Sequence, residues 1–226
     1  GNRKSCVPHA PYTVSKTLFQ LINRQNGGAD LTVSIHNQET PHENRFFQDK
    51  SGGFLDFFRL FDIPLDHFEA TGQASIQYAL QHMDPNQRTL FVHNTMTRPA
   101  DIRAAQSWSD RIYWATCPNA NLYIENRLPN YRSFLENDAR LCIGTDSLTS
   151  NWQLCVLEEL KTIARYQSYV PFETLLRWAT LNGAEALGFD DALGSLEPGK
   201  RPGLNLLVHL DLHGKLTESS AVRRII

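Results

Sequence analysis

The stretch Val33-Ser-Ile-His-Asn-Gln-Glu39 places a histidine, and three residues later a carboxylate, at the point where an apolar, β-branched run ends. Two other strand-like runs end in a similar way, Thr89-Leu-Phe-Val-His93 and Leu141-Cys-Ile-Gly-Thr-Asp146. In an α/β barrel, the catalytic groups lie at the C-terminal ends of several parallel strands. Polar residues that end separate apolar runs therefore predict one shared site, and their types predict a hydrolytic metalloenzyme or a large piece of one.

Strand-like and helix-like segments alternate along the chain, which favours an α/β fold with a parallel sheet and crossover helices. A further strand is predicted at Ser5–His9, followed by a helix with Ser15 as its N-cap. Other elements are predicted from the same patterns: helices at about 74–82, 99–107, 131–136, 153–166 and 171–180, and a strand at Ile112–Thr116.

Two segments interrupt this alternation. The segment 41–68 resembles an insertion at the catalytic face, and the helix-like spacing of its phenylalanines favours packing in a core. His42 and His67 lie in this insertion and are expected to be solvated. The change in composition after residue 193 predicts a barrel domain at residues 1–193 and part of a small β domain at residues 194–226.

The composition limits the possible function classes. A length of 226 residues allows one sizeable core but is short for a complete (β/α)₈ barrel of about 250 residues. The formal net charge of -2 offers no basic surface for nucleic acid or an anionic membrane, so a small molecule is the expected partner. No apolar run approaches the ~20 residues that span a bilayer. The cytoplasm is the expected location, because Cys6, Cys117, Cys142 and Cys155 are widely spaced and no signal peptide is recognisable.

Six motifs, in this order and spacing, resemble those of the amidohydrolase superfamily, in its cyclic-amidine deaminase and chlorohydrolase branch. They are Pro8-His-Ala-Pro-Tyr-Thr-Val-Ser15, Ser34-Ile-His-x-x-Glu39, His93-Asn-Thr, Cys117-Pro-x-x-Asn121, Gly144-Thr-Asp-Ser147 and the segment 182–200. The resemblance implies a (β/α)₈ TIM barrel, of which this chain holds strands four to eight, followed by the small β element. The motif Cys117–Asn121 is itself predicted to be a tight turn at a strand exit and not a nucleophile site.

The chain departs from the family pattern at the metal ligands of the first barrel strand. The family carries an H-x-H pair there, and none of the eight histidines of this chain forms one. The resemblance therefore implies that the chain corresponds to the C-terminal portion of a family member, with a further ~150–200 residues upstream. Since a closed site needs more ligands than this chain supplies, we expect it to hold a divalent metal weakly or not at all.

The remaining motif residues still form a coherent set for hydrolysis. His36 and Asp146 are the predicted ligands of one divalent metal, zinc being expected and iron or manganese being compatible. A metal-activated water would attack an electron-poor ring carbon, and Asp146 is placed to take its proton. The resemblance assigns to Glu39 the transfer of a proton to the ring nitrogen and the leaving ammonia. His93 would polarise the water or the tetrahedral intermediate, and His9 resembles the family position that contacts substrate.

Two classes of function follow from these residues. The first is an aminohydrolase that deaminates an amino-heterocycle such as a purine-like base or nucleoside, with a family hydrolase of C–Cl or cyclic amide bonds as the near alternative. The second is a non-catalytic fragment or binding module, which the missing H-x-H pair favours. Because family members often pair, a homodimer is the expected assembly.

Overall fold

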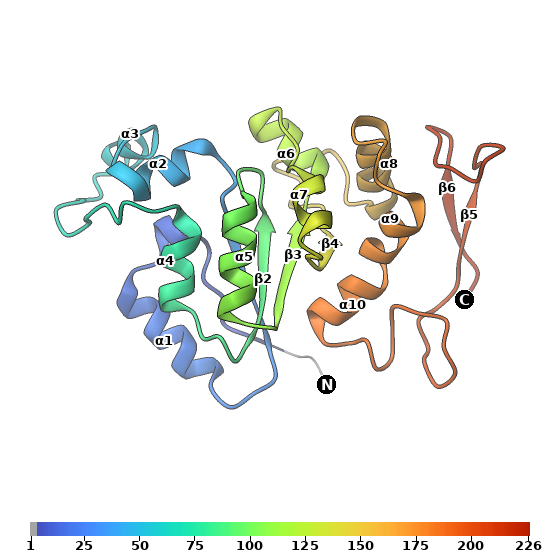
Figure 1. The fold of residues 1–226 in the computed structure, drawn as a ribbon, viewed down its shortest axis with the longest axis horizontal. Helices are drawn as coiled ribbons and strands as arrows, with labels where there is room; N and C mark the ends of the chain where they lie inside the picture. Colours follow the sequence, from blue (N-terminus) through green and yellow to red (C-terminus); the bar gives the residue numbers. More distant parts are fainter. Residues whose placement is uncertain (1–3) are drawn as a thin grey trace.

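The computed structural model describes residues 4–226, and its centre is a parallel sheet of four strands in the order β1-β2-β3-β4 (Figure 1). Their bounds are Thr32–Asn37, Arg88–His93, Ile112–Thr116 and Leu141–Ile143. Parallel strands that neighbour one another in sequence order, each reached through at least one helix, are consecutive units of a (β/α) barrel. The predicted α/β class and partial barrel are confirmed.

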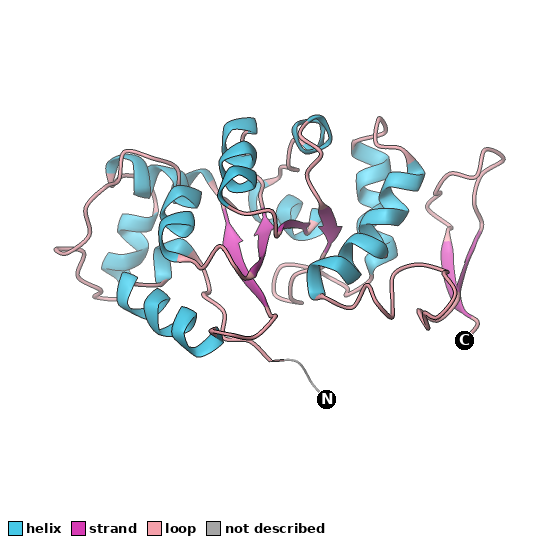
Figure 2. Ribbon diagram, turned by 60° about the horizontal axis from the view of Figure 1, so that its bottom comes forward, coloured by secondary structure: helices cyan, strands magenta, loops and turns pink. Residues whose placement is uncertain are grey.

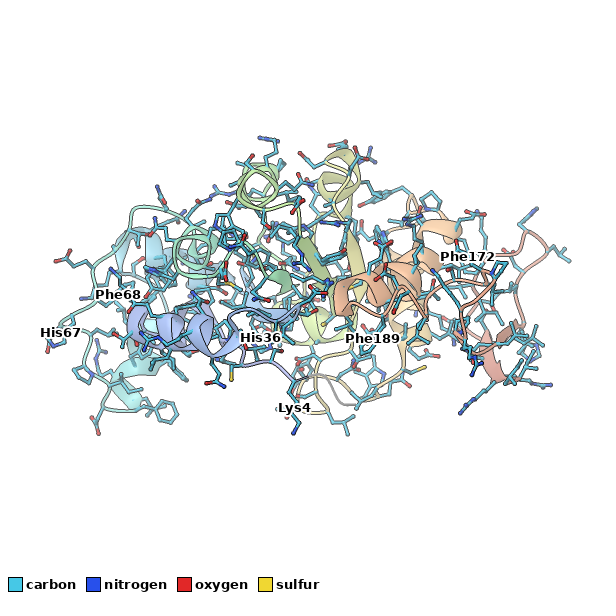
Figure 3. All side chains as sticks on the ribbon, turned by 90° about the horizontal axis from the view of Figure 1, so that it is seen from below. Lys4, His36, His67, Phe68, Phe172 and Phe189 are labelled. Atoms are coloured by element: carbon cyan, nitrogen blue, oxygen red, sulfur yellow. The ribbon has the colours of Figure 1, made fainter. Side chains whose placement is uncertain are left out.

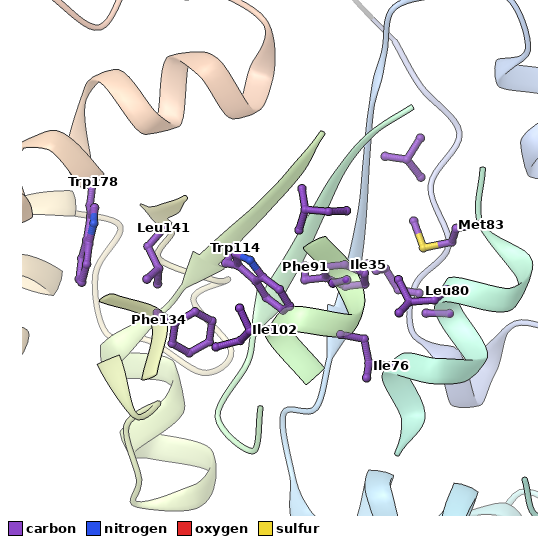
Figure 4. Close-up of a cluster of buried hydrophobic side chains, with 14 of the residues drawn as sticks. Ile35, Ile76, Leu80, Met83, Phe91, Ile102, Trp114, Phe134, Leu141 and Trp178 are labelled. Carbon is purple, nitrogen blue, oxygen red and sulfur yellow. The ribbon is translucent and has the colours of Figure 1, made fainter. Parts of the chain in front are cut away.

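One row of side chains runs in register across all four strands. Ile35 lies beside Phe91, Phe91 beside Trp114, and Trp114 beside Leu141. All four are buried in the main core, which Figure 4 shows between the sheet and its helices. Because side chains alternate along a strand, His36 belongs to the opposite face of the sheet. This register brings the C-terminal ends of β1 and β2 together.

Helices follow each of the four strands of this sheet (Figure 2). The Ser15 hydroxyl accepts a hydrogen bond from the Leu18 amide at 3.3 Å, so the predicted N-cap is present. The helices before β3 are η1 Pro11–Thr13, α1 Lys16–Asn26, α2 Pro41–Asp49, α3 Phe54–Leu60, α4 Ser75–His82 and α5 Pro99–Trp108. Those after β3 are α6 Pro118–Glu125, α7 Tyr131–Glu136, α8 Val156–Tyr166, α9 Phe172–Ala179 and α10 Leu181–Leu187. The sequence predicted α1, α4, α5, α7, α8 and α9.

The aromatic insertion forms α2 and α3 with a small core of its own. Phe46 stacks on Phe68 with 4.1 Å between ring centroids, and Tyr12 stacks on Phe54 at 4.2 Å. Phe46, Phe47 and Phe58 are buried. The expectation that these rings pack in a core is therefore confirmed, and the insertion is helical rather than an open loop.

Two local predictions are wrong. Ser5–His9 is not a strand, and its one backbone bond to β1 runs from the His36 amide to the His9 carbonyl at 3.0 Å. Pro8 has no N–H, so this segment cannot continue a hydrogen-bonded ladder. The motif Cys117–Asn121 is not a tight turn either, because it opens α6 with Pro118 in the first turn, where a missing N–H costs no hydrogen bond.

The C-terminal segment forms an antiparallel pair, β5 Asn205–Val208 and β6 Ala221–Arg224, at the end of the molecule away from α3 (Figures 1 and 2). Its loop contacts the barrel, where the Lys161 ammonium donates to the Glu218 carbonyl at 2.9 Å. Within residues 4–226, none of the helices combines the length and apolar character needed to cross a membrane.

Candidate active site

The site forms where β1, β2 and β4 end. His36 lies one residue before the end of β1, and His93 is the last residue of β2. The backbone at His93 and Asn94 is left-handed, with φ of 74° and 61°, which turns the chain sharply at the end of the strand. The His36 and His93 rings stack with centroids 5.2 Å apart. Asp146, also left-handed at φ 57°, follows β4 by three residues.

His36, His93 and Asp146 each offer one ligand atom, and these atoms lie within 4.8 Å of one another. The Nδ1 atom of His36 lies 2.8 Å from the His9 carbonyl oxygen, which only accepts hydrogen bonds. Nδ1 therefore carries the proton and Nε2 keeps its lone pair. The same holds for His93, whose Nδ1 lies 2.9 Å from Oδ1 of Asn121. Two imidazole nitrogens held in this way and one carboxylate oxygen fit a divalent metal such as zinc.

Glu39 lies against this cluster. Its Oε1 is 3.4 Å from Nε2 of His93, and its side chain is 16% exposed. Burial raises the pKa of Glu39, while His36 lowers it and Asp146 raises it further. A carboxyl group with a raised pKa is suited to exchange a proton near neutral pH. Burial lowers the pKa of His93, whereas its hydrogen bond with Asn121 and the charge of Asp146 act to raise it.

His9 takes part in the site through both its backbone and its ring. Its carbonyl accepts hydrogen bonds from the amide and from Nδ1 of His36 at 3.0 and 2.8 Å. Its exposed ring lies 4.9 Å from that of His36 and contacts the Thr13 hydroxyl at 2.8 Å. Burial lowers the pKa of His9, and the neighbouring His36 lowers it further. The structure thus brings together all five residues that the sequence singled out.

The sequence missed the residues that hold this cluster in place. Asn121 orients His93, although its motif was interpreted as a turn. Glu43, fully buried, accepts hydrogen bonds from the Gln38 and Glu39 amides. Its position in the first turn of the helix begun by Pro41 was a signal for a capping role.

A second buried network supports the segment of Asp146. The Asn151 side chain donates to the Thr145 carbonyl and to Glu159, both at 2.7 Å. Glu159 also accepts from the backbone and side chain of Asn119, both at 2.9 Å. No short motif links these three residues, which meet only through the packing of α6 and α8. The network joins the start of both helices to the residue before Asp146.

The histidines of the insertion lie outside the cluster. His42 is exposed and accepts a hydrogen bond from the Gly53 amide at 3.0 Å. His67 is exposed and lies at one end of the molecule, whereas His36 lies near its middle (Figure 3). Both side chains are solvated, as predicted.

Comparison with known proteins gives the following relationships. A model described as the Amidohydrolase family matches residues 5–220. A 5-methylthioadenosine/S-adenosylhomocysteine deaminase of Pyrococcus abyssi is 30% identical over 189 residues, which are 80% of this chain and 39% of the relative. An adenosine deaminase structure from Xanthomonas campestris with bound zinc matches with a TM-score of 0.69 and 28% identity, over 88% of this chain and 42% of that one. Helicobacter pylori aminofutalosine deaminase, at 24% identity, shares the fold with a TM-score of 0.75 over 88% of this chain and 49% of that one. The chain spans less than half the length of each.

Proposed function

The chain belongs to the amidohydrolase family, and from this premise we propose that it provides the hydrolytic half-site of a metal-dependent aminohydrolase. The substrate is an amino-heterocycle such as a purine-like base or nucleoside, and the product is ammonia. The observation that carries the proposal is the convergence of His36, His93 and Asp146 within 4.8 Å, with Glu39 beside them. The deaminase names of the relatives support the substrate class.

Each residue has a role that its surroundings favour. His36 and Asp146 hold the metal, which is zinc in the Xanthomonas campestris relative. When bound, the metal acts as a Lewis acid and lowers the pKa of water. Glu39 carries a proton to the ring nitrogen and then to the leaving amine, because burial raises the pKa of this carboxyl. His93, whose Nε2 lies 3.4 Å from Glu39, orients the reacting groups, and His9 contacts the substrate from the rim.

The small-molecule partner, the homodimer and the cytoplasmic location remain predictions from the sequence. The division at residue 193 also remains a prediction.

Ammonia release from adenosine and from substituted purine nucleosides, measured with the intact zinc-loaded enzyme to which this chain contributes its half-site, tests the proposal. Asp146→Asn should abolish metal-dependent turnover. Glu39→Gln should keep its metal and lower kcat by roughly 10²–10⁴, the scale of losing a proton-transfer group. Glu69→Gln, which replaces an exposed carboxylate just after the insertion, is the matched control and should behave like wild type. Full activity of Glu39→Gln, or zinc-loaded wild type that releases no ammonia, would refute the assignment.

A further inference from the structure

Glu43 is a buried carboxyl group with an unusual set of partners. It is the third residue of α2, and its side chain is 0% exposed. In a capping box, a glutamate here bonds the amide of the N-cap residue. Glu43 instead reaches past Thr40, with Oε1 accepting from the Gln38 amide at 2.8 Å and Oε2 from the Glu39 amide at 3.1 Å. Each carboxyl oxygen thus serves one of two consecutive amides.

These two amides belong to the turn that aims Glu39 at His93. Gln38 is left-handed at φ 48°, an uncommon conformation for a residue with a side chain. Its side chain is also anchored, because its Oε1 accepts from the Thr97 hydroxyl at 2.7 Å and its Nε2 donates to Asp101 at 3.2 Å. Hydrogen bonds therefore hold both the backbone amide and the side chain of Gln38 in this left-handed turn.

Helix capping alone does not explain this arrangement. The N-cap residue of α2, Thr40, has a buried hydroxyl without a hydrogen-bond partner among residues 4–226. Burying a carboxyl group is unfavourable unless its oxygens are satisfied, and Glu43 satisfies both on the segment that carries Glu39. The same contacts pair the buried Gln38 amide and the partly buried Glu39 amide with acceptors.

We propose that Glu43 is a positioning residue for the proton-transfer group Glu39, an inference that rests on the proposed deaminase function. Holding the two amides keeps the Glu39 carboxyl at 3.4 Å from His93, within reach of a bound substrate. Displacement of a catalytic group by about 1 Å is enough to lower a rate by as much as ~10².

A double-mutant cycle tests this role. Glu43→Gln keeps the side-chain size but has only one acceptor oxygen for two amides. We expect kcat to fall at least about tenfold with KM nearly unchanged. In the Glu39→Gln background the same substitution should lower kcat no further, because Glu43 acts through Glu39. Glu43→Asp keeps both carboxyl oxygens on a shorter side chain, so its kcat should fall less than that of Glu43→Gln. If Glu43→Gln does not fold, Glu43→Asp takes its place in the cycle.

Two further measurements separate positioning from a general loss of stability. Ile76→Val, a fully buried site in α4, is the matched control and should lower the melting temperature without lowering kcat. Hydrogen exchange of the peptide 36–44 should be at least about tenfold faster in Glu43→Gln than in wild type or Ile76→Val. Equal loss of kcat in both Glu39 backgrounds, or unchanged exchange, would overturn the inference. A protected wild-type segment together with no ammonia release would instead refute the proposed function.

Discussion

Asn121 determines which nitrogen of His93 faces the site. Its Oδ1 lies 2.9 Å from Nδ1 of His93, and its Nδ2 donates to the His93 carbonyl at 3.4 Å. This orientation of the amide requires a proton on Nδ1 and leaves Nε2 free toward Glu39 and Asp146. A partner of this kind fixes both the tautomer and the ring orientation of a metal-site histidine.

Asn121→Leu should therefore lower kcat, because His93 is then free to rotate or change tautomer. The expected loss of activity is about 10–100-fold, the usual effect of removing a partner of this kind. Ammonia release at saturating substrate measures it. The control is Asn23→Leu, which removes an amide that donates to the His82 carbonyl at 2.7 Å, away from the site. Equal kcat values in both variants would contradict the role of Asn121.

The sequence identifies the residues that carry chemistry better than the residues that hold them. His36, His93 and Asp146 each end an apolar run, so a local pattern and the rule for parallel strands suffice to place them together. Asn121 meets a histidine that is 28 residues away in sequence. Because local periodicity does not specify a contact of this kind, only the packing of α6 against the end of β2 reveals it.

The insertion shows, at the scale of whole elements, that local sequence patterns do not specify contacts between distant residues. Its aromatic spacing predicted a core, and Phe46 and Phe58 are buried in one. The sequence did not predict how the end of this insertion is held against α2. The Lys50 ammonium donates hydrogen bonds to the carbonyls of Leu65 and Phe68 at 2.8 and 2.9 Å, and local spacing does not specify such contacts. The helix α6 was missed for a related reason, since a proline after a strand is compatible with both a turn and a first helical turn.

Glu43, at the start of the insertion, gives this element a pH dependence. Burial raises the pKa of Glu43 to about 7. A carboxyl group with a raised pKa in the folded state favours folding when protonated, so its contribution is complete below its unfolded pKa and is lost as the pH rises to about 7. Relative to Glu43→Gln, wild type should lose on the order of 3 kcal/mol of unfolding free energy over this range. Urea unfolding of both proteins at several pH values measures the difference. A constant difference, or one that shifts in favour of wild type as the pH rises, would contradict the prediction.

At the scale of the molecule, the parallel sheet brings together side chains from distant parts of the sequence. The neighbouring parallel strands β1 to β4 end at one edge of the sheet (Figure 1). The parallel sheet could be predicted, because alternating strands and helices favour this arrangement. The conformation of the segment Ser5–His9 could not be predicted, because its contact with β1 depends on a single backbone hydrogen bond next to Pro8.

The central claim is that His36 and Asp146, 110 residues apart, form one metal site. Calorimetric titration of zinc into metal-free protein tests it most directly. We predict one zinc ion per chain, bound weakly enough for dialysis to remove it because no H-x-H pair contributes. Binding should disappear in both His36→Gln and Asp146→Asn and persist in His67→Gln, whose histidine is exposed and lies outside the cluster. Zinc binding that is unchanged in His36→Gln and Asp146→Asn would contradict the account.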